Sequence, residues 1–249
     1  MIRRLATNIL LSFFGLALIP SAAQALTLVT EENPPFNYTE QGKVVGISTE
    51  IVSELGKRAG IAMQIQSMPW ERAYITAQAE KETCIYSTVR LENRERLFSW
   101  IGPIARNKWV LIGKTDFAGS VKTVEDARKY RVGVVAKDAK IEFLMSKGVT
   151  DLREVSEDGL NPPRLVLSRD DPNRIDLWAT SAYGARGTAA RSGVKDIKLI
   201  LTLRDVPLYL ACGRHTSPET VRALTRALEQ SNKDGSLKRI IKRHALESF

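Results

Sequence analysis

The sequence has few of the residues from which metal and thiol sites are built. Its 249 residues include only two cysteines and two histidines. The histidines, His215 and His244, stand apart and have no metal-ligand spacing. The chain also lacks a nucleophile elbow, a glycine-rich phosphate loop and a zinc pattern. We therefore predict no metal, no cofactor and no catalytic residue.

Long hydrophobic runs are also missing from most of the chain. No apolar run after residue 25 approaches the roughly 20 residues that a membrane helix needs. Near the start, Arg3 and Arg4 precede an apolar run over residues 9–19, and Ala23 and Ala25 form a small-residue cleavage site. This pattern predicts a signal peptide over residues 1–25 and a mature chain in the periplasm. No cysteine stands at the cleavage site, so no lipid anchor is expected, and a retained anchor is the alternative.

Acidic residues are scarcer than basic ones, with 28 Asp and Glu against 37 Lys and Arg, and the net charge is +9. A basic balance often indicates nucleic-acid binding. Here the basic residues are dispersed and the chain is expected to be exported. We therefore expect no nucleic-acid partner, and we interpret the charge as an aid to solubility that also attracts anionic solutes.

Strand and helix patterns alternate along the mature chain. Apolar runs typical of strands occupy residues 26–30, 61–65, 84–89, 109–113, 131–136, 152–155, 174–178, 198–203 and 206–213. Helical spacing occupies residues 47–59, 70–77, 138–147, 161–162, 181–192, 217–228 and 237–241. Ser48 is the expected N-cap of the first helix, and Gly60 ends it. The order predicts an α/β protein with mostly parallel, doubly wound sheets and helices on both faces.

The stretch from residue 84 to residue 103 carries the clearest functional signal. An apolar strand there runs into a basic loop, which is typical of an anion site in an open α/β sheet. Ser87 and Thr88 lie where the strand ends, and the loop contains Arg90 and Arg94. A guanidinium can hold a carboxylate through two parallel hydrogen bonds. The alternative is a solvated turn held by salt bridges.

The β/α pattern falls into two units, and the terminal helices belong with the first. We expect one lobe made of residues 26–107 and 206–249 and a second made of residues 108–205. The chain would cross between them twice, with hinges near residues 105–109 and 204–207. A cleft between such lobes is a usual place for a small ligand.

Short motifs in a fixed order connect the mature chain to a known family. They lie at residues 30–36, 46–51, 69–70, 87–94, 131–135, 174–176 and 234–241. Together they resemble the family 3 periplasmic solute-binding proteins, the substrate-capturing subunits of importers driven by ATP-binding cassettes. The resemblance implies a two-lobed type II periplasmic binding fold, a small-molecule solute, a membrane permease as partner, and a monomer.

The resemblance also implies parts of the site. The family places a carboxylate-binding arginine seven residues after a serine, and these positions are Arg94 and Ser87 here. Its usual ammonium-binding aspartate is Ser181 in this chain, which makes a free α-amino acid less certain as the ligand, and Asp138 is a possible replacement acid. The candidate ligand-binding residues are Arg94, Ser87, Thr88, Trp70, Asp138, Ser181, Glu31, Arg90 and Trp178.

Several of these residues have a structural alternative. Arg94 can instead form a surface salt bridge. Trp70, which falls where the family often places a wall against the ligand, can be ordinary core. Asp138 can simply begin a helix, where a carboxylate is favourable.

The two cysteines have an expected pairing that comes from the resemblance. In the family fold, the strand at residues 206–213 returns beside the strand that begins at Cys84 and runs the opposite way. Cys84 and Cys212 would then reach the same end of the sheet, within reach of a disulfide. Two buried free thiols are the alternative.

Three functions are compatible with the sequence. The first is a binding protein that closes over a small carboxylated solute and delivers it to an importer. The second is an enzyme, because the family includes a dehydratase of cyclic carboxylic acids that would use Glu31, Glu71 or Asp138 for proton transfer. The third is an exported sensor that reports a solute to a membrane partner.

Overall fold

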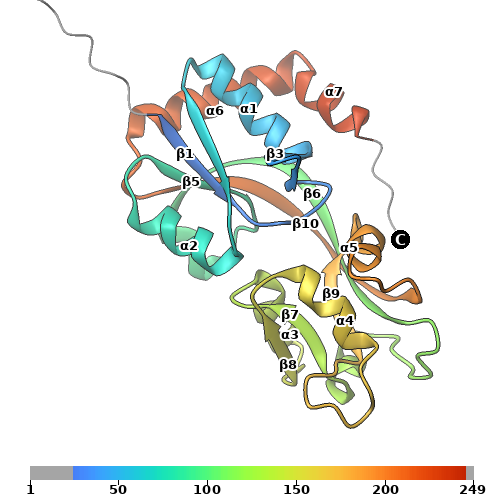
Figure 1. Cartoon of the computed structure of the whole chain (residues 1–249). Coiled ribbons are helices and arrows are strands. Elements are labelled where there is room, and N and C mark those ends of the chain that lie inside the picture. Colours follow the sequence, from blue (N-terminus) through green and yellow to red (C-terminus); the bar gives the residue numbers. More distant parts are fainter. Residues whose placement is uncertain (1–24, 245–249) are drawn as a thin grey trace, which may run out of the picture.

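Two long antiparallel strands, β6 (Phe98–Lys114) and β10 (Ile197–Gly213), run through both lobes of the molecule (Figure 1). The computed structural model describes residues 25–244. Its main sheet has eight strands in the order β4-β1-β5-β10-β6-β9-β7-β8. In this sheet β1 pairs with β4 and β5, and β7 with β8 and β9, in parallel, whereas every pair that involves β6 or β10 is antiparallel. Strands β2 and β3 form a separate antiparallel pair. The expected two-lobed α/β fold is therefore confirmed, with the sheets of the two lobes joined into one.

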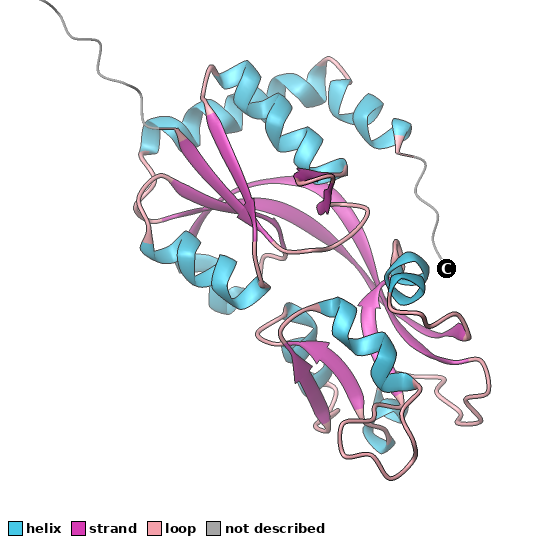
Figure 2. Cartoon of the chain, in the orientation of Figure 1, coloured by secondary structure: helices cyan, strands magenta, loops and turns pink. Residues whose placement is uncertain are grey.

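The strands and helices alternate as the sequence predicts (Figure 2). The other strands are β1 (Leu26–Thr30), β2 (Tyr38–Glu40), β3 (Lys43–Val45), β4 (Met63–Ser67), β5 (Thr83–Thr88), β7 (Val132–Val135), β8 (Leu152–Val155) and β9 (Leu177–Ser181). The helices are α1 (Ile47–Ala59), α2 (Trp70–Ala79), α3 (Ala139–Ser146), α4 (Asn161–Leu165), α5 (Ala185–Arg191), α6 (Pro218–Lys233) and α7 (Ser236–Arg243), with short 3₁₀ turns η1 (Glu92–Leu97), η2 (Glu125–Lys129) and η3 (Asp158–Leu160). No helix within residues 25–244 is long and apolar enough to cross a membrane.

Strand β5 shows how the first lobe builds its core. Successive side chains of a strand point to opposite faces of the sheet. Cys84 and Tyr86 pack in the core that α1, α6 and α7 cover, whereas Ile85 packs with Trp70 and Ala77 of α2. All six residues of β5 are buried, including the hydroxyl-bearing Thr83, Ser87 and Thr88 at its two ends. The C-terminal end of this strand therefore has a fixed place at the junction of the lobes.

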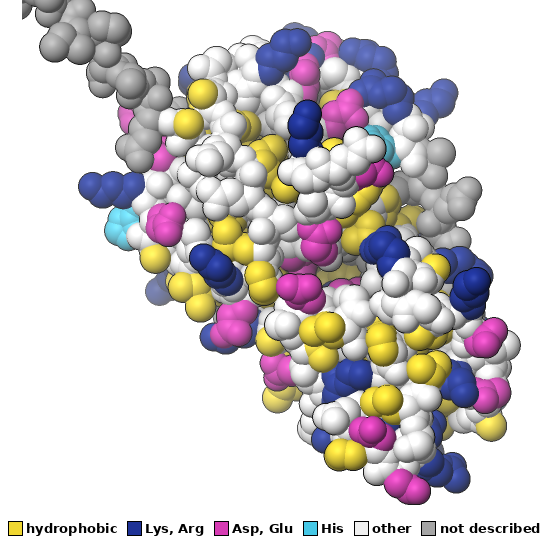
Figure 3. Space-filling model, viewed as in Figure 1, with side chains coloured by type: hydrophobic (Ala, Val, Ile, Leu, Met, Phe, Trp, Pro, Cys, Tyr) yellow, Lys and Arg dark blue, Asp and Glu magenta, His cyan; other side chains and the backbone are white. Residues whose placement is uncertain are grey.

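The buried side chains of the described chain divide between the lobes. Apart from three residues near the junction, two clusters draw on residues 26–105 and 206–240. The other two clusters draw on residues 110–197. This division supports, as a proposal, the lobe limits expected from the sequence. In the space-filling view, the lobes touch along their junction (Figure 3).

Several helix and strand limits differ from the expectation, and three of the differences have a local cause. Ser48 is not the N-cap of α1, because Gly46 takes that position with a φ of 114°. A Cβ at Gly46 would lie 2.6 Å from the carbonyl oxygen of Phe36, so no other residue fits there. Strand β9 begins at Leu177, because the Asp176 carboxylate instead accepts from the Arg131 backbone N–H at 3.0 Å. Helix α5 begins at Ala185, after Gly184 at a φ of 90°.

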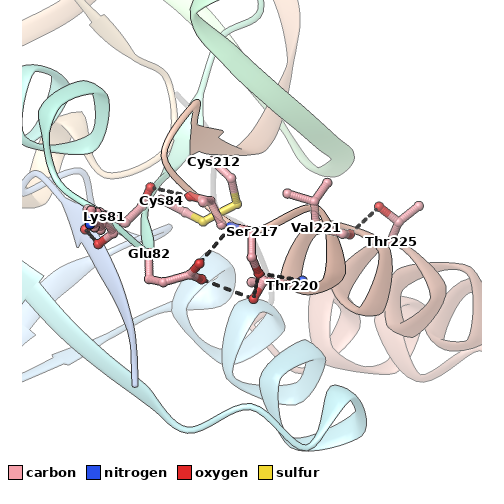
Figure 4. Close-up of a disulfide and its surroundings, with 10 residues drawn as sticks. Lys81, Glu82, Cys84, Cys212, Ser217, Thr220, Val221 and Thr225 are labelled. Atoms are coloured by element: carbon pink, nitrogen blue, oxygen red, sulfur yellow. Dashed lines mark hydrogen bonds between the residues drawn. A yellow bond between two sulfur atoms is a disulfide. The ribbon is translucent and has the colours of Figure 1, made fainter. Parts of the chain in front are cut away.

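A disulfide joins Cys84 to Cys212, as the family resemblance implied (Figure 4). The two residues are direct partners in the antiparallel pair β5–β10, and both are fully buried. Beside them, the Glu82 carboxylate accepts from the Ser217 backbone N–H at 2.7 Å and from the Thr220 hydroxyl at 3.1 Å. The disulfide and these bonds together attach the returning chain to the start of β5.

Gly213 provides a test of this packing. A Cβ at Gly213 would lie 1.8 Å from the carbonyl oxygen of Ala77, so the backbone of α2 would have to move. We expect Gly213→Ala to lower the free energy of unfolding by about 1–3 kcal/mol or more in urea denaturation. Gly187→Ala is the control, because Gly187 lies in α5 with its nearest neighbouring atom 3.6 Å away. That control should be neutral or stabilising by up to about 1 kcal/mol, and equal stability of the two variants would contradict the packing.

Candidate functional site

A small cavity lined by residues of both lobes lies at their junction. Its walls come from the C-terminal ends of β1, β5 and β9, from the crossing strand β6, and from the starts of α2 and α3. Ligands of open α/β sheets bind at such strand ends. Six of the nine predicted ligand residues line the cavity: Glu31, Trp70, Ser87, Arg94, Asp138 and Ser181.

Arg94 is the most distinctive of these residues. It lies in η1, its exposed fraction is 7%, and its guanidinium stands 5.5 Å from the Trp70 ring centre and 5.0 Å from that of Tyr74. Nη2 donates to the carbonyl oxygen of Lys137 at 2.9 Å. Nη1 is buried and has no hydrogen-bond partner among the described residues. A buried donor without a partner is costly, so Nη1 favours an incoming acceptor.

The backbone carbonyl of Lys137, in the second lobe, accepts hydrogen bonds from the first lobe. Trp70 of the first lobe donates its Nε1–H to this oxygen at 3.1 Å, alongside Arg94. The Lys137 ammonium lies 3.0 Å from the Glu71 carboxylate. Lys137 has a φ of 57°, an uncommon value for a residue with a side chain. The structure therefore shows the lobes in contact, with Trp70 both packed in the core and facing the cavity.

The hydroxyl residues at the end of β5 differ from each other. Ser87 has a φ of 59° and donates its hydroxyl to Oδ1 of Asn37 at 2.5 Å. It lines the cavity beside Arg94. Thr88 is buried, and its hydroxyl has no partner among the described residues, but it does not line this cavity. Of the pair, only Ser87 is therefore placed to contact a ligand there.

Two other predicted residues lie outside the cavity. Arg90 is exposed to solvent on the turn after β5, where its guanidinium donates to the Glu95 carboxylate. The alternative of a solvated turn held by salt bridges therefore applies to Arg90 and not to Arg94, which is buried. Trp178 is fully buried, and its Nε1–H donates to the Asp158 carboxylate at 2.8 Å. Trp178 therefore orients an acid of the cavity wall instead of forming that wall.

Asp138 combines a structural role with a place in the cavity. Its carboxylate caps α3 by accepting from the Lys140 backbone N–H at 2.7 Å, and it accepts from the Lys140 ammonium at 2.8 Å. Burial lowers the pKa of Lys140, but the charges of Asp138 and Asp158 raise it by more than burial lowers it. The pKa of Lys140 therefore lies above its usual value. The acid that was expected to hold a ligand ammonium therefore already has a cationic partner in the chain.

Glu31, Glu32 and Asp158 are the cavity acids without a cationic hydrogen-bond partner among residues 25–244, and Glu32 accepts from Thr39 and Ser67. Asp158 accepts from Trp178 and from the Thr180 hydroxyl, at 2.6 Å. The Glu31 carboxylate has no hydrogen bond or ion pair that the structure of residues 25–244 shows. Burial, followed by the charge of Asp138, raises the pKa of Glu31 to about 8. Burial also raises the pKa of Asp158. With a pKa of about 8, Glu31 therefore carries a proton at neutral pH.

Several cavity residues were not predicted from the sequence. One of them is Asn107 of β6, which lies near an expected hinge. Its Oδ1 accepts from the hydroxyl of Ser181, a predicted residue, at 2.7 Å. Asp158 comes from a short turn after β8 that matches no motif. Lys140 lies in the first turn of α3, and its sequence context does not distinguish it from an ordinary helix residue. The described residues contain no group of histidine, cysteine and acidic side chains that could hold a metal ion.

The comparisons with known proteins agree with this architecture. The family model of bacterial extracellular solute-binding proteins, family 3, matches residues 26–247. No curated protein matches the chain. A histidine kinase sensor domain described as similar to periplasmic binding proteins is 13% identical, covers 91% of this chain and 98% of its own, and has a TM-score of 0.80.

Two further solved structures are similar in the same way. The arginine-, lysine-, histidine-binding protein ArtJ from Geobacillus stearothermophilus is 15% identical, with 91% of this chain and 97% of that chain covered and a TM-score of 0.77. The ancestral amino acid-binding protein AncCDT-1, a precursor of cyclohexadienyl dehydratase, is 18% identical, with 88% and 94% covered and a TM-score of 0.71. Identities this low show a shared fold and nothing finer.

Proposed function

Because this chain belongs to the bacterial extracellular solute-binding proteins, family 3, we propose that it captures a small carboxylated solute between its lobes. The observation that carries the proposal is the buried Nη1 of Arg94, which has no partner within the described residues and lines the interlobe cavity. A solute carboxylate would accept from Nη1 and from a neighbouring backbone N–H, or from the Ser87 hydroxyl if this gives up its bond to Asn37. A charge-assisted bond of this kind is stronger than one between neutral groups.

Closure of the lobes explains how binding is signalled to a partner. Cavity walls come from both lobes, so only the closed state makes all the contacts, and a ligand stabilises that state. We place the hinges at residues 105–109 and 204–207. These segments pair with each other in β6 and β10, and the register shifts between Thr202 and Arg204 and again between Leu208 and Leu210. Such irregularities disrupt the ladder and let strands bend.

The partner that we propose is a membrane permease of an ATP-binding-cassette importer, met in the periplasm by a monomer. The predicted signal peptide over residues 1–25 supports this location, although residues 1–24 lie outside the described part of the chain. A sensing role is the related alternative, because the histidine kinase sensor domain has the same fold.

A dehydratase is a second candidate function, and one observation favours it. A carboxyl group with a pKa of about 8 is protonated at neutral pH, as a general acid must be, and Glu31 has this property inside the cavity. Asp138, one of the acids that could act as its base, is instead paired with Lys140. We therefore propose binding without catalysis as the main function.

A thermal-shift screen tests the proposal. Amino acids, small peptides and organic acids would be added separately to the purified protein, with Arg94→Ala screened in parallel. We expect at least one carboxylated compound to stabilise the wild type and not the variant. Stabilisation only by compounds without a carboxylate would contradict the proposal. Incubation with prephenate-like acids separates the candidates, because a dehydratase converts them and a binding protein does not.

A further inference from the structure

A further cavity lies in the second lobe, at the end that is far from the first lobe. We call it the distal cavity; its lining comes from residues 114–119, 130 and 165–176, and its volume is about 510 Å³, within the range of ligand pockets. Strand β9 relates the two cavities, because Ser181 at its end lines the interlobe cavity and Asp176, just before its start, lines the distal one. Five residues of strand span roughly 15–17 Å, and the arrow of β9 points toward the first lobe (Figure 1). The two cavities share no lining residue, so they are separate sites.

Part of the distal cavity is aromatic. Phe117 and Tyr130 pack with their ring centres 5.1 Å apart, and both side chains are partly exposed. Gly119 lies directly beside them, and a Cβ at this position would overlap the Phe117 ring and the Tyr130 hydroxyl. The missing side chain at residue 119 therefore leaves the aromatic pair in place. Partly exposed rings of this kind offer a surface on which the apolar body of a ligand can pack.

The charged residues of the distal cavity leave an excess of positive charge. Three of them are basic and two are acidic: Lys114, Arg169, Arg174, Asp116 and Asp176. The Lys114 ammonium donates to the Asp116 carboxylate at 3.0 Å and lowers the pKa of this acid, which is therefore ionised at neutral pH. The Asp176 carboxylate accepts from the Arg131 backbone N–H and lies 3.7 Å from the Arg131 guanidinium, which is outside the lining. Each acid thus has a cation of its own, and two arginines of the lining remain.

These two arginines lack hydrogen-bond acceptors. The Arg174 guanidinium makes no hydrogen bond within residues 25–244, because its nearest acid, Asp176, is 3.7 Å away and its Nε is buried without a partner. Arg169 is exposed, and its side chain has no partner in the part of the chain that the structure describes. A guanidinium normally bonds carboxylate or phosphate oxygens, often in pairs. An anion that entered the distal cavity would supply acceptors that the chain itself does not.

We propose that the distal cavity is a second ligand site, which binds a small aromatic carboxylate. Its carboxylate would accept from Arg169 and Arg174, and its ring would pack on Phe117 and Tyr130. An inorganic anion could use only the arginines, and a neutral aromatic compound only the rings, so both should bind more weakly. The inference does not depend on the proposed function, because the distal cavity contains no residue of the interlobe cavity.

Amide NMR titrations with benzoate, benzamide and inorganic phosphate test the inference, because they report on each cavity separately. Benzamide has the ring without the charge, and phosphate has the charge without the ring. We expect benzoate to move the Gly119 and Ile175 signals saturably, with a dissociation constant at least about fivefold lower than that of either other compound. Arg174→Gln should weaken benzoate binding at these signals at least about tenfold, since it removes a charge-assisted contact. Arg169→Gln repeats the test at an exposed position, where the fold is not at risk.

Two controls make the result specific to this cavity. Arg191→Gln should bind benzoate like the wild type, because Arg191 is exposed on α5 of the same lobe and lines neither cavity. Arg174→Gln should melt within about 3 °C of the wild type, because it loses no hydrogen bond of the described chain. The inference is overturned if benzoate leaves the Gly119 and Ile175 signals unmoved, if both arginine variants bind it as tightly as the wild type, or if benzamide or phosphate binds equally well. Movement of the Ser87 signal alone would place benzoate in the interlobe cavity, which overturns this inference and leaves carboxylate capture there intact.

Discussion

Replacing Arg94 by alanine should lower the affinity for the solute by a few hundred-fold or more, equivalent to about 3–5 kcal/mol. The variant removes the buried Nη1 that has no partner in the described chain, so the solute carboxylate would be left without its cation. It also removes the Nη2 bond to the Lys137 carbonyl, which connects the lobes in the closed state. Both losses act in the same direction. Calorimetry with the solute found by the screen measures the effect.

Two further variants make this result interpretable. Arg94→Lys should recover only part of the affinity, because an ammonium cannot bond both the solute and the Lys137 carbonyl in the geometry of the guanidinium. Arg96→Ala is the matched control, since Arg96 lies two residues along the same turn and is exposed. It should bind within about twofold of wild type. If Arg94→Ala bound within about threefold of wild type, Arg94 would not be the carboxylate site.

The place of Arg94 in the site could be predicted from the sequence, but its hydrogen bonds could not. The spacing from Ser87 to Arg94 indicated an anion site after a buried strand, and the structure places both residues in one cavity. The sequence also suggested that both guanidinium nitrogens would hold a carboxylate. In the closed structure one of them is bonded to Lys137 instead. That contact depends on an uncommon backbone conformation in the other lobe, 43 residues away in the chain.

The acidic residues of the cavity were harder to predict from the sequence than Arg94. Glu31 could be named because it follows the first strand directly, where parallel strands place their ligand residues. Asp158 could not, because its turn follows the edge strand β8, and only tertiary hydrogen bonds from Trp178 and Thr180 hold its carboxylate in the cavity wall. Asp138 was predicted as a ligand residue through the family resemblance, as a possible replacement for the acid that is Ser181 here. The sequence did not reveal that Lys140, two residues later, would form an ion pair with Asp138.

The long crossing strands were also only partly predictable. The pattern gave separate apolar runs at residues 109–113, 198–203 and 206–213. In the structure, β6 and β10 each continue for 17 residues, through polar and proline-containing segments. Pro207 and Asn107 interrupt the apolar pattern but lie within the paired strands, where the ladder of the partner strand holds them. Tertiary pairing here overrides local propensity.

Removal of the disulfide should have the largest effect on stability. The bond joins residues that are 128 positions apart, and chain entropy for a loop of this size suggests a loss of about 4–5 kcal/mol. The variant Cys84→Ala with Cys212→Ala leaves no unpaired polar group in the buried site. Because one kcal/mol corresponds to about 2–4 °C in a domain of this size, the melting temperature should fall by roughly 10–20 °C.

The same variant distinguishes stability from binding. Neither cysteine lines the interlobe cavity, and both lie fully buried in the first lobe. Solute affinity measured well below the melting temperature should therefore stay within about twofold of wild type. A reducing agent should destabilise the wild type by a similar amount and leave the double variant unchanged. If urea denaturation shows a loss below about 1 kcal/mol, or if the denatured, unreduced protein titrates two free thiols, Cys84 and Cys212 do not stabilise the fold as a disulfide.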